Sequence, residues 1–386
     1  MSDIVIAGIG QTPVNEHWDI SIRELGFEAM EAALHDAGHL RPQALFVGNM
    51  LAPTLSGQAH LGALLADFAG LGGIEASVIE AAGASGGAAL RQAFMAVASG
   101  MVNVAMVVGV EKFTDKVGTA VEAAAGTATD ADYEAVQGLT PLAQSAVLMR
   151  RYMHEYNVPH EAFAGFAVVA HANGAGNPNA MFRKAIKRET YLNAGLVSDP
   201  LNLFDAAPNA DGAAALILTR RDLLPPHFSH PLVRISGSAL ATDTLALHDR
   251  PNPLALNAAR LSVERACRQA GILPQDVDFF ELCDASSILA ALSLEAAGFA
   301  ESGKGWLLAE EGALNLNGTL PIATMGGLKA RGNPGGATGV YQAVEAALQL
   351  RGQAGQNQLP NPRRALIQAL GGPASTAVAH ILERIE

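Results

Sequence analysis

The chain has 386 residues, of which 49% are hydrophobic, 16% charged and 5% aromatic, and its formal net charge is −12. This length and composition predict two or three domains with a large apolar core and exclude a disordered chain. The negative charge, without a basic stripe, argues against a nucleic-acid binder, because binding phosphates requires positive charge that displaces counterions.

Further absences in the sequence narrow the class of protein. No apolar stretch reaches the roughly 18 residues that span a bilayer, and the N-terminal MSDIVIAGIG has no basic segment typical of a signal peptide. Two cysteines, Cys267 and Cys283, are too few for a disulfide framework or a four-cysteine zinc site. No histidine has metal-ligand spacing. We therefore expect a cytoplasmic protein with no membrane, nucleic-acid or metal partner.

The first predicted elements are a strand over residues 4–10 and an amphipathic helix over residues 21–37. Ser21 and Glu24 stand at capping-box spacing at the helix start, and apolar residues form one stripe along it. This helix and the strand after it recur later in the chain. The segment ALHDAGHLRPQALFVG matches ACRQAGILPQDVDFFE at an offset of 233 residues.

A second pair of matching segments consists of two long helices that open with Gly-Gly-Ala at Gly86 and Gly335. Both are apolar nearly all round, which predicts burial on every side, and a strand follows each. We expect an α/β fold of five layers, helix–sheet–helix–sheet–helix, in which residues 1–225 and 226–386 form two similar halves. These two helices should touch between the sheets. The alternative is two unrelated domains with accidental similarity.

Between about residues 112 and 202 charges and glycines increase. Short helices such as LAQSAVLMRRYMHEYNV are broken by loops such as ANGAGNPNAMF. This pattern predicts an inserted loop domain over the first half. Long insertions in an α/β scaffold commonly shape a binding site at the strand ends.

Five segments, in order and over the full length, resemble thiolases, in particular the archaeal and sterol-carrier-protein-X-type branch. They are EAAGASGGAA (80–89), HANGAGNPNAMFRK (171–184) with VSDPLNLFDAAPNADGAAA (197–215), ELCDAS (281–286), GGLKARGNPGGATG (326–339) and ALGGPAST (369–376). The resemblance implies a thiolase-like αβαβα fold. It also implies an enzyme that makes or breaks a C–C bond next to the carbonyl of an acyl-CoA thioester. In that family a cysteine at a helix N-terminus takes the acyl group, a histidine helps activate it, and oxyanion holes stabilise the intermediates.

The sequence departs from the family at the reactive positions. Gly83 stands at the nucleophile position, Asn333 at the histidine of the Gly-His-Pro segment, and Cys283 at the histidine of the His-Asp motif. Glycine forms no acyl-enzyme, and a carboxamide donates a hydrogen bond but takes up no proton near neutral pH. The missing side chain at Gly83 is expected to leave room for a bulkier acyl group. The backbone N–H groups at Gly83 and Gly372 are expected to persist as oxyanion donors.

We therefore predict that Gly83, Cys283, Asn333 and Gly372 are the catalytic positions and converge on one cavity. Cys283 is either a relocated reactive thiol or a small buried apolar filler. The neighbouring Asp284 would raise its pKa and so argues against a nucleophile.

Four further residues are predicted to bind the substrate or its CoA: His171, Arg183, Asp284 and Gly371. His171 and Arg183 fall in the loop region that shapes the CoA and acyl pocket in the family. The alternative is that His171 is structural and that Arg183 only solvates a loop.

Two functions remain open. The first is an enzyme of lipid metabolism on acyl-CoA thioesters that uses no acyl-enzyme, either an aldolase or an atypical acyltransferase. It would hold no bound cofactor and would be a homodimer joined by an edge strand, VAMVVGV or VIEAAGA. It could work with a zinc-ribbon/OB-fold acyl-CoA-binding partner, as some relatives do. The second is a catalytically silent subunit with a structural or regulatory role in a complex, which the loss of both cysteine and histidine favours.

Overall fold

The computed structural model describes residues 3–226 and 228–386. The first half contains β1 (Ile4–Gln11), α1 (Ile22–Asp36), β2 (Ala44–Gly48), α2 (Ala52–Leu55), α3 (Leu61–Phe68), β3 (Glu75–Ile79), α4 (Ser85–Ala98), β4 (Val104–Glu111) and, after the insertion, β7 (Gly212–Arg220). The insertion contains α5 (Thr119–Gly126), α6 (Pro141–Tyr156), α7 (Ala164–Gly176), α8 (Arg188–Leu192), β5 (Leu196–Ser198) and β6 (Leu201–Asn202). The second half contains β8 (Leu232–Thr242), α9 (Asn257–Ala270), β9 (Phe279–Glu281), α10 (Ser287–Ala296), α11 (Leu307–Glu310), α12 (Thr338–Arg351), β10 (Arg364–Gly371) and β11 (Thr376–Ile385).

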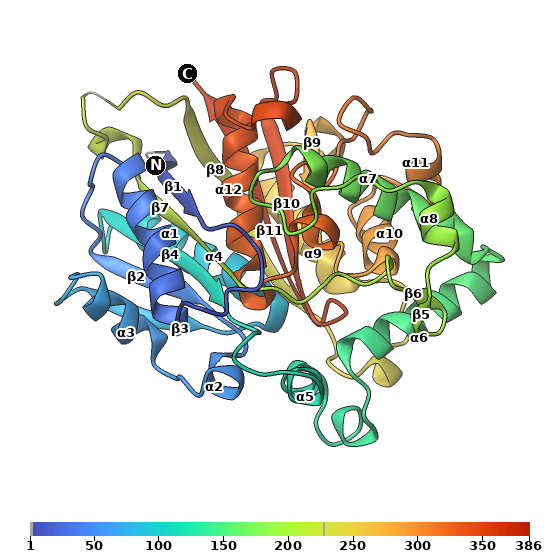
Figure 1. Cartoon of the computed structure of the whole chain (residues 1–386). Helices are drawn as coiled ribbons and strands as arrows, with labels where there is room; N and C mark the ends of the chain where they lie inside the picture. The colour runs from blue at the N-terminus through green and yellow to red at the C-terminus, as the bar shows by residue number, and fades with distance from the viewer. Residues whose placement is uncertain (1–2, 227) are drawn as a thin grey trace.

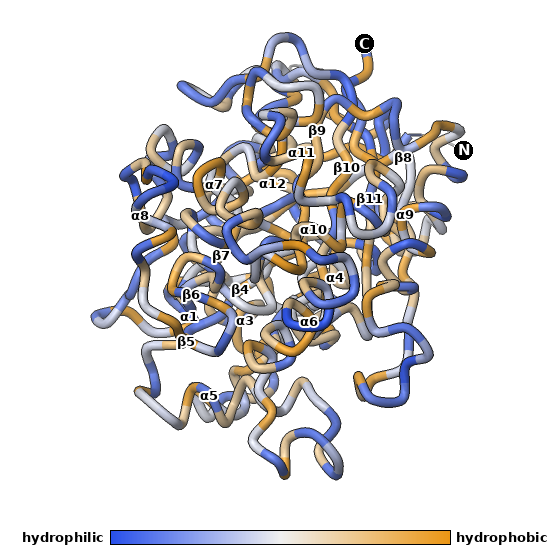
Figure 2. The backbone as a smooth tube through the Cα atoms, turned by 90° about the vertical axis from the view of Figure 1, so that its right-hand side faces the viewer, coloured by the Kyte–Doolittle hydropathy of each residue, from blue (hydrophilic) through white to orange (hydrophobic). Residues whose placement is uncertain are grey.

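The capping signal that the sequence predicts at the start of α1 is present in the structure. The Ser21 side chain accepts a hydrogen bond from the backbone N–H of Glu24, and the Glu24 carboxylate accepts one from the N–H of Ser21, so α1 begins with a complete capping box. The apolar face of α1 then packs on β1 and β7. In Figure 2 the outer loops are largely hydrophilic and the interior elements largely hydrophobic.

The sheet consists of two similar parts. Its strand order is β3-β2-β4-β7-β1-β8-β11-β10-β9. In each part a parallel pair, β2–β4 or β9–β10, is followed by antiparallel neighbours. The prediction of two similar halves is therefore confirmed. The parts are not separate sheets, however, because the pairing of Val5 with Arg234 joins β1 to β8.

Helices α4 and α12 form the middle layer, between the two parts of the sheet (Figure 1). Glycines let their N-terminal ends approach closely. A Cβ on Gly86 would lie 2.9 Å from the carbonyl oxygen of Gly336, and a Cβ on Gly339 would lie 2.3 Å from the backbone nitrogen of Gly87. Contacts this short leave no room for a side chain. The predicted contact between the two apolar helices is thus confirmed.

The sequence pattern suggested that the insertion lies over the first half, but most of its apolar residues pack against the second half. Its helices α6 and α7 pack against α10 of the second half and share that half's outer apolar core. Its contacts with the first half include those between α5 and α2 and the hydrogen bond from the N–H of Val14 to the carbonyl oxygen of Asn179. The physical reason is that α10 is apolar nearly all round and needs cover on its outer side. Periodicity in α6 shows that it has an apolar face but not which half that face meets.

The two candidate edge strands differ in their places. The segment VAMVVGV forms β4, which lies between β2 and β7 and is therefore not an edge. Residues 75–79 form β3, the outermost strand of the first half, where Val78 is 39% exposed. Within residues 3–226 and 228–386, no helix has the length and apolar character that a bilayer crossing needs.

Candidate functional site

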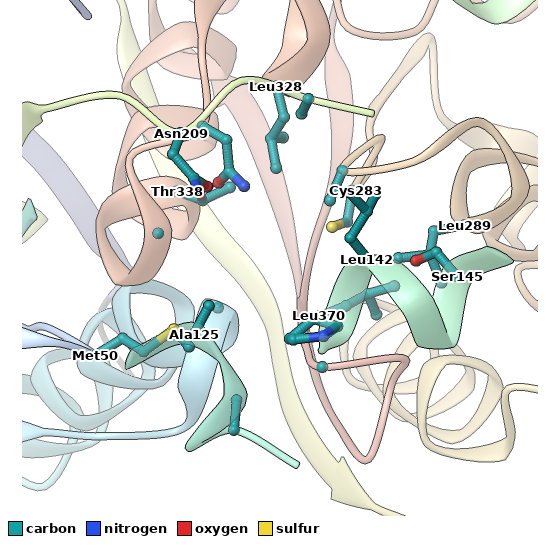
Figure 3. A pocket seen from close by; sticks show the side chains of 18 of the residues that line it. Met50, Ala125, Leu142, Ser145, Asn209, Cys283, Leu289, Leu328, Thr338 and Leu370 are labelled. Carbon is teal, nitrogen blue, oxygen red and sulfur yellow. The ribbon is translucent and has the colours of Figure 1, made fainter. Parts of the chain in front are cut away.

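A cavity of about 210 Å³ lies where the two halves and the insertion meet. Gly83, Cys283, Asn333 and Gly372 all line it, as the sequence predicted (Figure 3). Three of them follow strands at the carboxyl end of the sheet, because β3 leads into Gly83, β9 into Cys283 and β10 into Gly372, whereas Asn333 follows the turn Gly327–Arg331. Open α/β sheets bind ligands at this edge. The arrangement therefore places the four predicted catalytic positions together.

Gly83 lies in a single 3₁₀ turn, Ala82–Ala84, directly before α4. The residue before it, Ala82, has a φ of 50°, so the turn is tight. A Cβ on Gly83 would lie 2.7 Å from the carbonyl oxygen of Leu370. The end of β10 thus fills the space in which a side chain would begin. The expectation that Gly83 leaves room for a bulkier acyl group is wrong at this point of the cavity wall.

Cys283 lines the cavity, whereas Cys267 does not, and the sulfur of Cys283 is drawn toward the open space in Figure 3. Its side chain is buried, with 4% of its surface exposed. The pKa of the Cys283 thiol is raised to about 11, chiefly by burial; the backbone N–H of Ala285 lowers it and the charge of Asp284 adds to the rise. A thiol with this pKa stays protonated at neutral pH, so it is a poor nucleophile. These properties favour the packing interpretation of Cys283.

Asn333 is held by hydrogen bonds on both sides of its backbone. Its N–H donates to the carbonyl oxygen of Pro208 at 2.9 Å, and its own carbonyl oxygen accepts from the N–H of Ala210 at 3.1 Å. Its side-chain Oδ1 accepts a hydrogen bond from the Thr338 hydroxyl at 3.3 Å. Because Oδ1 is occupied, the amide Nδ2 is the group left to donate to a ligand.

Asp284 lies outside the cavity lining and is fully buried behind it. Its carboxylate accepts hydrogen bonds from the backbone N–H groups of Leu328, at 2.7 Å, and Lys329, at 3.4 Å. Burial raises the pKa of Asp284, while the positive charge of Lys329 opposes that rise. The carboxylate therefore fixes the turn Gly327–Arg331, which leads directly into Asn333. A direct contact between Asp284 and the substrate stays a prediction, and Asp284 is not among the residues that line the cavity.

The other three predicted binding residues do not line the cavity, although Gly371 lies between the lining residues Leu370 and Gly372. His171 is part of α7, not of a loop, and its ring stacks on Phe182 with 5.9 Å between centroids. Burial lowers the pKa of His171 to about 4, so it is neutral at physiological pH. Arg183 is exposed on the surface, and Gly371 pairs with Thr376 in the sheet.

The helix around His171 extends to Gly176 through a segment whose glycines and asparagines read as loop. Tertiary hydrogen bonds explain the difference. The Asn173 side chain donates to the carbonyl oxygens of Ile322 and Ala323, at 3.1 and 3.0 Å. These bonds hold the end of α7 against the second half and outweigh the weak helix propensity of the segment.

The structure adds cavity residues that the sequence reasoning missed. Asn209 and Thr338 lie on one wall, and Leu142 and Leu289 lie on the other side of the opening in Figure 3. Asn209 and Thr338 fall inside the segments that resemble the family, but their types alone carry no catalytic signal. In the part of the chain that the structure describes, no cluster of three or more His, Cys, Asp or Glu is arranged to hold a metal ion.

Comparison with known protein families identifies the family of this chain. The family described as "Thiolase, N-terminal domain" matches residues 4–222, and the one described as "Thiolase C-terminal domain-like" matches residues 239–384. The chain belongs to the thiolase family. The resemblance inferred from the sequence segments is thus confirmed, as is the α/β thiolase fold.

Relatives within the thiolase family differ in their named activities. The acetyl-CoA acetyltransferase of Methanothermobacter thermautotrophicus is 40% identical over 386 residues, which cover 100% of both chains. Sterol carrier protein 2 of Gallus gallus is 32% identical over 226 residues, 58% of this chain and 41% of that protein. The solved structure "Ltp2-ChsH2(DUF35) aldolase" matches with a TM-score of 0.83 at 26% identity and covers 99% of this chain and 98% of that one. The thiolase family therefore includes both an acyltransferase and an aldolase similar to this chain.

Proposed function

We propose that this thiolase-family chain makes or breaks a C–C bond next to the carbonyl of an acyl-CoA thioester without forming an acyl-enzyme. One observation carries the proposal. The cavity keeps hydrogen-bond donors, but the thiol that lines it has a pKa of about 11, and Gly83 carries no side chain. Donors without a nucleophile suit an aldolase-type reaction better than acyl transfer.

The chemistry requires no covalent intermediate with the protein. In the cleavage direction, a 3-hydroxyacyl thioester loses its hydroxyl proton to water, and that oxygen becomes a carbonyl. The electron pair of the broken C–C bond moves to the thioester as an enolate, whose α-carbon then takes up a proton. Negative charge develops on the thioester oxygen, where hydrogen-bond donors of the cavity wall would stabilise it, and the candidate donors include the Asn333 amide and the backbone N–H groups of Gly83 and Gly372.

The CoA portion would reach the cavity from the side of the insertion. Ala125 and Ala128 in and after α5, and Leu142 in α6, line the cavity there. Arg183 is the predicted contact for the CoA phosphates, because it is exposed on the same insertion. In this proposal CoA enters as part of the substrate, and the chain itself carries no cofactor.

A partner subunit and a second copy of the chain belong to the same proposal. The aldolase structure similar to this chain is a complex with a DUF35 subunit. This supports a partner of the zinc-ribbon/OB-fold acyl-CoA-binding kind. The unpaired outer edge of β3 supports a homodimer, because exposed edge strands otherwise invite aggregation.

The test is incubation with a panel of 3-hydroxyacyl-CoA and 3-oxoacyl-CoA thioesters, with and without neighbouring gene products. We expect cleavage of the carbon skeleton of a 3-hydroxyacyl-CoA, detected as a new aldehyde or ketone and a shorter acyl-CoA. Formation of acetyl-CoA from a 3-oxoacyl-CoA and free CoA would instead indicate a thiolytic acyltransferase. If neither reaction occurs under any condition, the chain is the silent subunit of a complex.

A further inference from the structure

The two carboxamides that line the cavity, Asn209 and Asn333, lie on the same wall. Asn209 is solvent-exposed within the cavity and comes from the first half, whereas Asn333 comes from the second. Figure 3 shows Asn209 beside Thr338, with Leu142 and Leu289 on the far side of the opening. A ligand in this cavity therefore meets amide donors on one side and apolar side chains on the other.

Backbone hydrogen bonds place the two carboxamides side by side. Asn333 donates to Pro208 and accepts from Ala210, which makes Asn209 and Asn333 a parallel bridge pair. Paired residues in neighbouring extended segments point their side chains to the same face. The bridge thus directs both amides into the cavity, although they come from different halves of the chain.

The loop that carries Asn209 is fixed by the residue two positions later. The buried Asp211 carboxylate accepts hydrogen bonds from the backbone N–H groups of Phe113, at 2.6 Å, and His17, at 2.9 Å. A carboxylate that accepts several backbone bonds is a rigid anchor, because losing any of them leaves a buried group unsatisfied. Asn209 is therefore held in a prearranged backbone.

Thr338 determines the direction of the Asn333 amide. Its side chain is 2% exposed, and it is the first residue of α12, so its own position is fixed. Its hydroxyl donates to Asn333 Oδ1 at 3.3 Å. This hydrogen bond fixes the position of the Asn333 amide, and in this arrangement Oδ1 faces Thr338 and Nδ2 is left to donate to a ligand.

We propose that Asn209 and Asn333 together form a two-donor oxyanion hole for the thioester carbonyl, and that Thr338 is the positioning residue that holds the Asn333 side chain in place. The proposal rests on the proposed function, since it names the acyl-CoA thioester as the ligand. It assigns a catalytic role to Asn209. Two donors carried on a fixed backbone and directed at one oxygen would stabilise a developing enolate with little movement during the reaction.

Infrared spectroscopy of bound acetyl-CoA, isotopically labelled at the thioester carbonyl, tests the donors without requiring turnover. We expect the carbonyl stretch to move to lower frequency on the wild-type protein, and Asn209→Ala and Asn333→Ala each to reverse part of that shift. Thr338→Val should reverse part of it and Thr338→Ser should restore it. The exposed Asn193→Ala serves as the control and should match wild type. A carbonyl band that Asn209→Ala leaves unchanged, or a wild-type band without any shift, overturns the proposal.

Kinetics separate this inference from the proposed function. On a substrate that the wild type cleaves, loss of either donor should lower kcat by about 10²-fold with a smaller change in KM, because the donors act on charge that develops in the transition state. Wild-type cleavage that Asn209→Ala leaves intact overturns the two-donor hole but not the proposed function. A shifted, Asn209-dependent carbonyl band without any C–C chemistry supports the hole and overturns the proposed function.

Discussion

The carbonyl oxygen of Leu370 lies 2.7 Å from the position that a Cβ atom on Gly83 would occupy. The missing side chain at Gly83 therefore leaves no empty space in the cavity wall. The end of β10 has closed on the turn before α4, and the wall of the cavity at this point is backbone. Because the backbone occupies the place of the nucleophile side chain, a non-covalent reaction fits the cavity better than a reaction through an acyl-enzyme.

Restoring a side chain at this position should destabilise the fold. Gly83→Ala and Gly83→Cys both add a Cβ against a backbone oxygen, and we expect each to lower the free energy of unfolding by about 2 kcal/mol, as overpacking does. Gly195→Ala is a suitable control, because a Cβ there meets no atom within 4 Å. Urea denaturation measures the three variants. Wild-type stability in Gly83→Cys, together with rapid acylation by acetyl-CoA, would contradict this picture of the cavity wall.

The Cys283 thiol should react slowly with alkylating reagents. Burial raises its pKa to about 11, so at pH 7.5 we expect its rate with iodoacetamide to be at least ~10²-fold below that of a free thiol, whose pKa is about 8.5. The rate should keep rising with pH beyond 9, which separates a raised pKa from simple inaccessibility. Peptide mapping by mass spectrometry distinguishes Cys283 from Cys267. A rate that levels off near neutral pH would mean that the thiol is activated.

Acid should destabilise the protein partly through His380, which lies on β11 and contacts the carbonyl oxygen of Gly87 at 3.1 Å. Burial lowers its pKa to about 4. An unfolded histidine, with a pKa of about 6.5, takes up a proton first as pH falls, so the stability is present above pH 6.5 and lost between pH 6.5 and 4.

We therefore expect His380→Gln, which keeps a donor for Gly87, to reduce the loss of unfolding free energy between pH 7 and 5 by about 2 kcal/mol. Urea denaturation at several pH values provides the measurement. The exposed His154→Gln controls for the loss of a histidine and should have the unfolding free energy of the wild type at pH 7. An identical pH dependence in His380→Gln and wild type would show that His380 does not resist protonation.

The homodimer proposal predicts that charge on the outer edge of β3 separates the subunits. Val78→Glu adds a carboxylate to this strand, which already carries Glu75, and should weaken dimerisation at least tenfold. Val117→Glu changes another exposed valine, outside the sheet, and should leave the dimer intact. Light scattering over a concentration series measures both. A wild-type monomer at micromolar concentration would refute the proposal.

The sequence contained enough information for the fold because the fold depends on repeated local signals. The Ser21–Glu24 capping box and the Gly-Gly-Ala openings at Gly86 and Gly335 are short-range patterns, and each has a direct structural counterpart. The convergence of Gly83 and Cys283 followed from their places after strands of the two halves, β3 and β9. Such placement depends on topology, which the repeat supplied.

The parts of the site that could not be predicted depend on long-range contacts. Asn209 pairs with Asn333 across 124 positions of sequence, and nothing near Asn209 signals this bridge. The closure of Leu370 on Gly83 is likewise a tertiary effect. Asp284 read as a binding residue because it is charged beside Cys283, yet its carboxylate is used by backbone N–H groups of the following turn. The residue type shows that Asp284 carries a charge, but it does not show that the hydrogen-bond partners are the backbone N–H groups of Leu328 and Lys329.

The most direct test of the central claim is to search for an acyl-enzyme during turnover. The protein, with its partner subunit if activity requires one, is mixed with a 3-hydroxyacyl-CoA that it cleaves, quenched in acid within the first turnovers and measured by intact mass spectrometry. The account predicts product formation with no protein molecule heavier by an acyl group, because Gly83 offers no nucleophile and Cys283 stays protonated. An acyl adduct on Cys283 that forms and decays at the rate of turnover would contradict it.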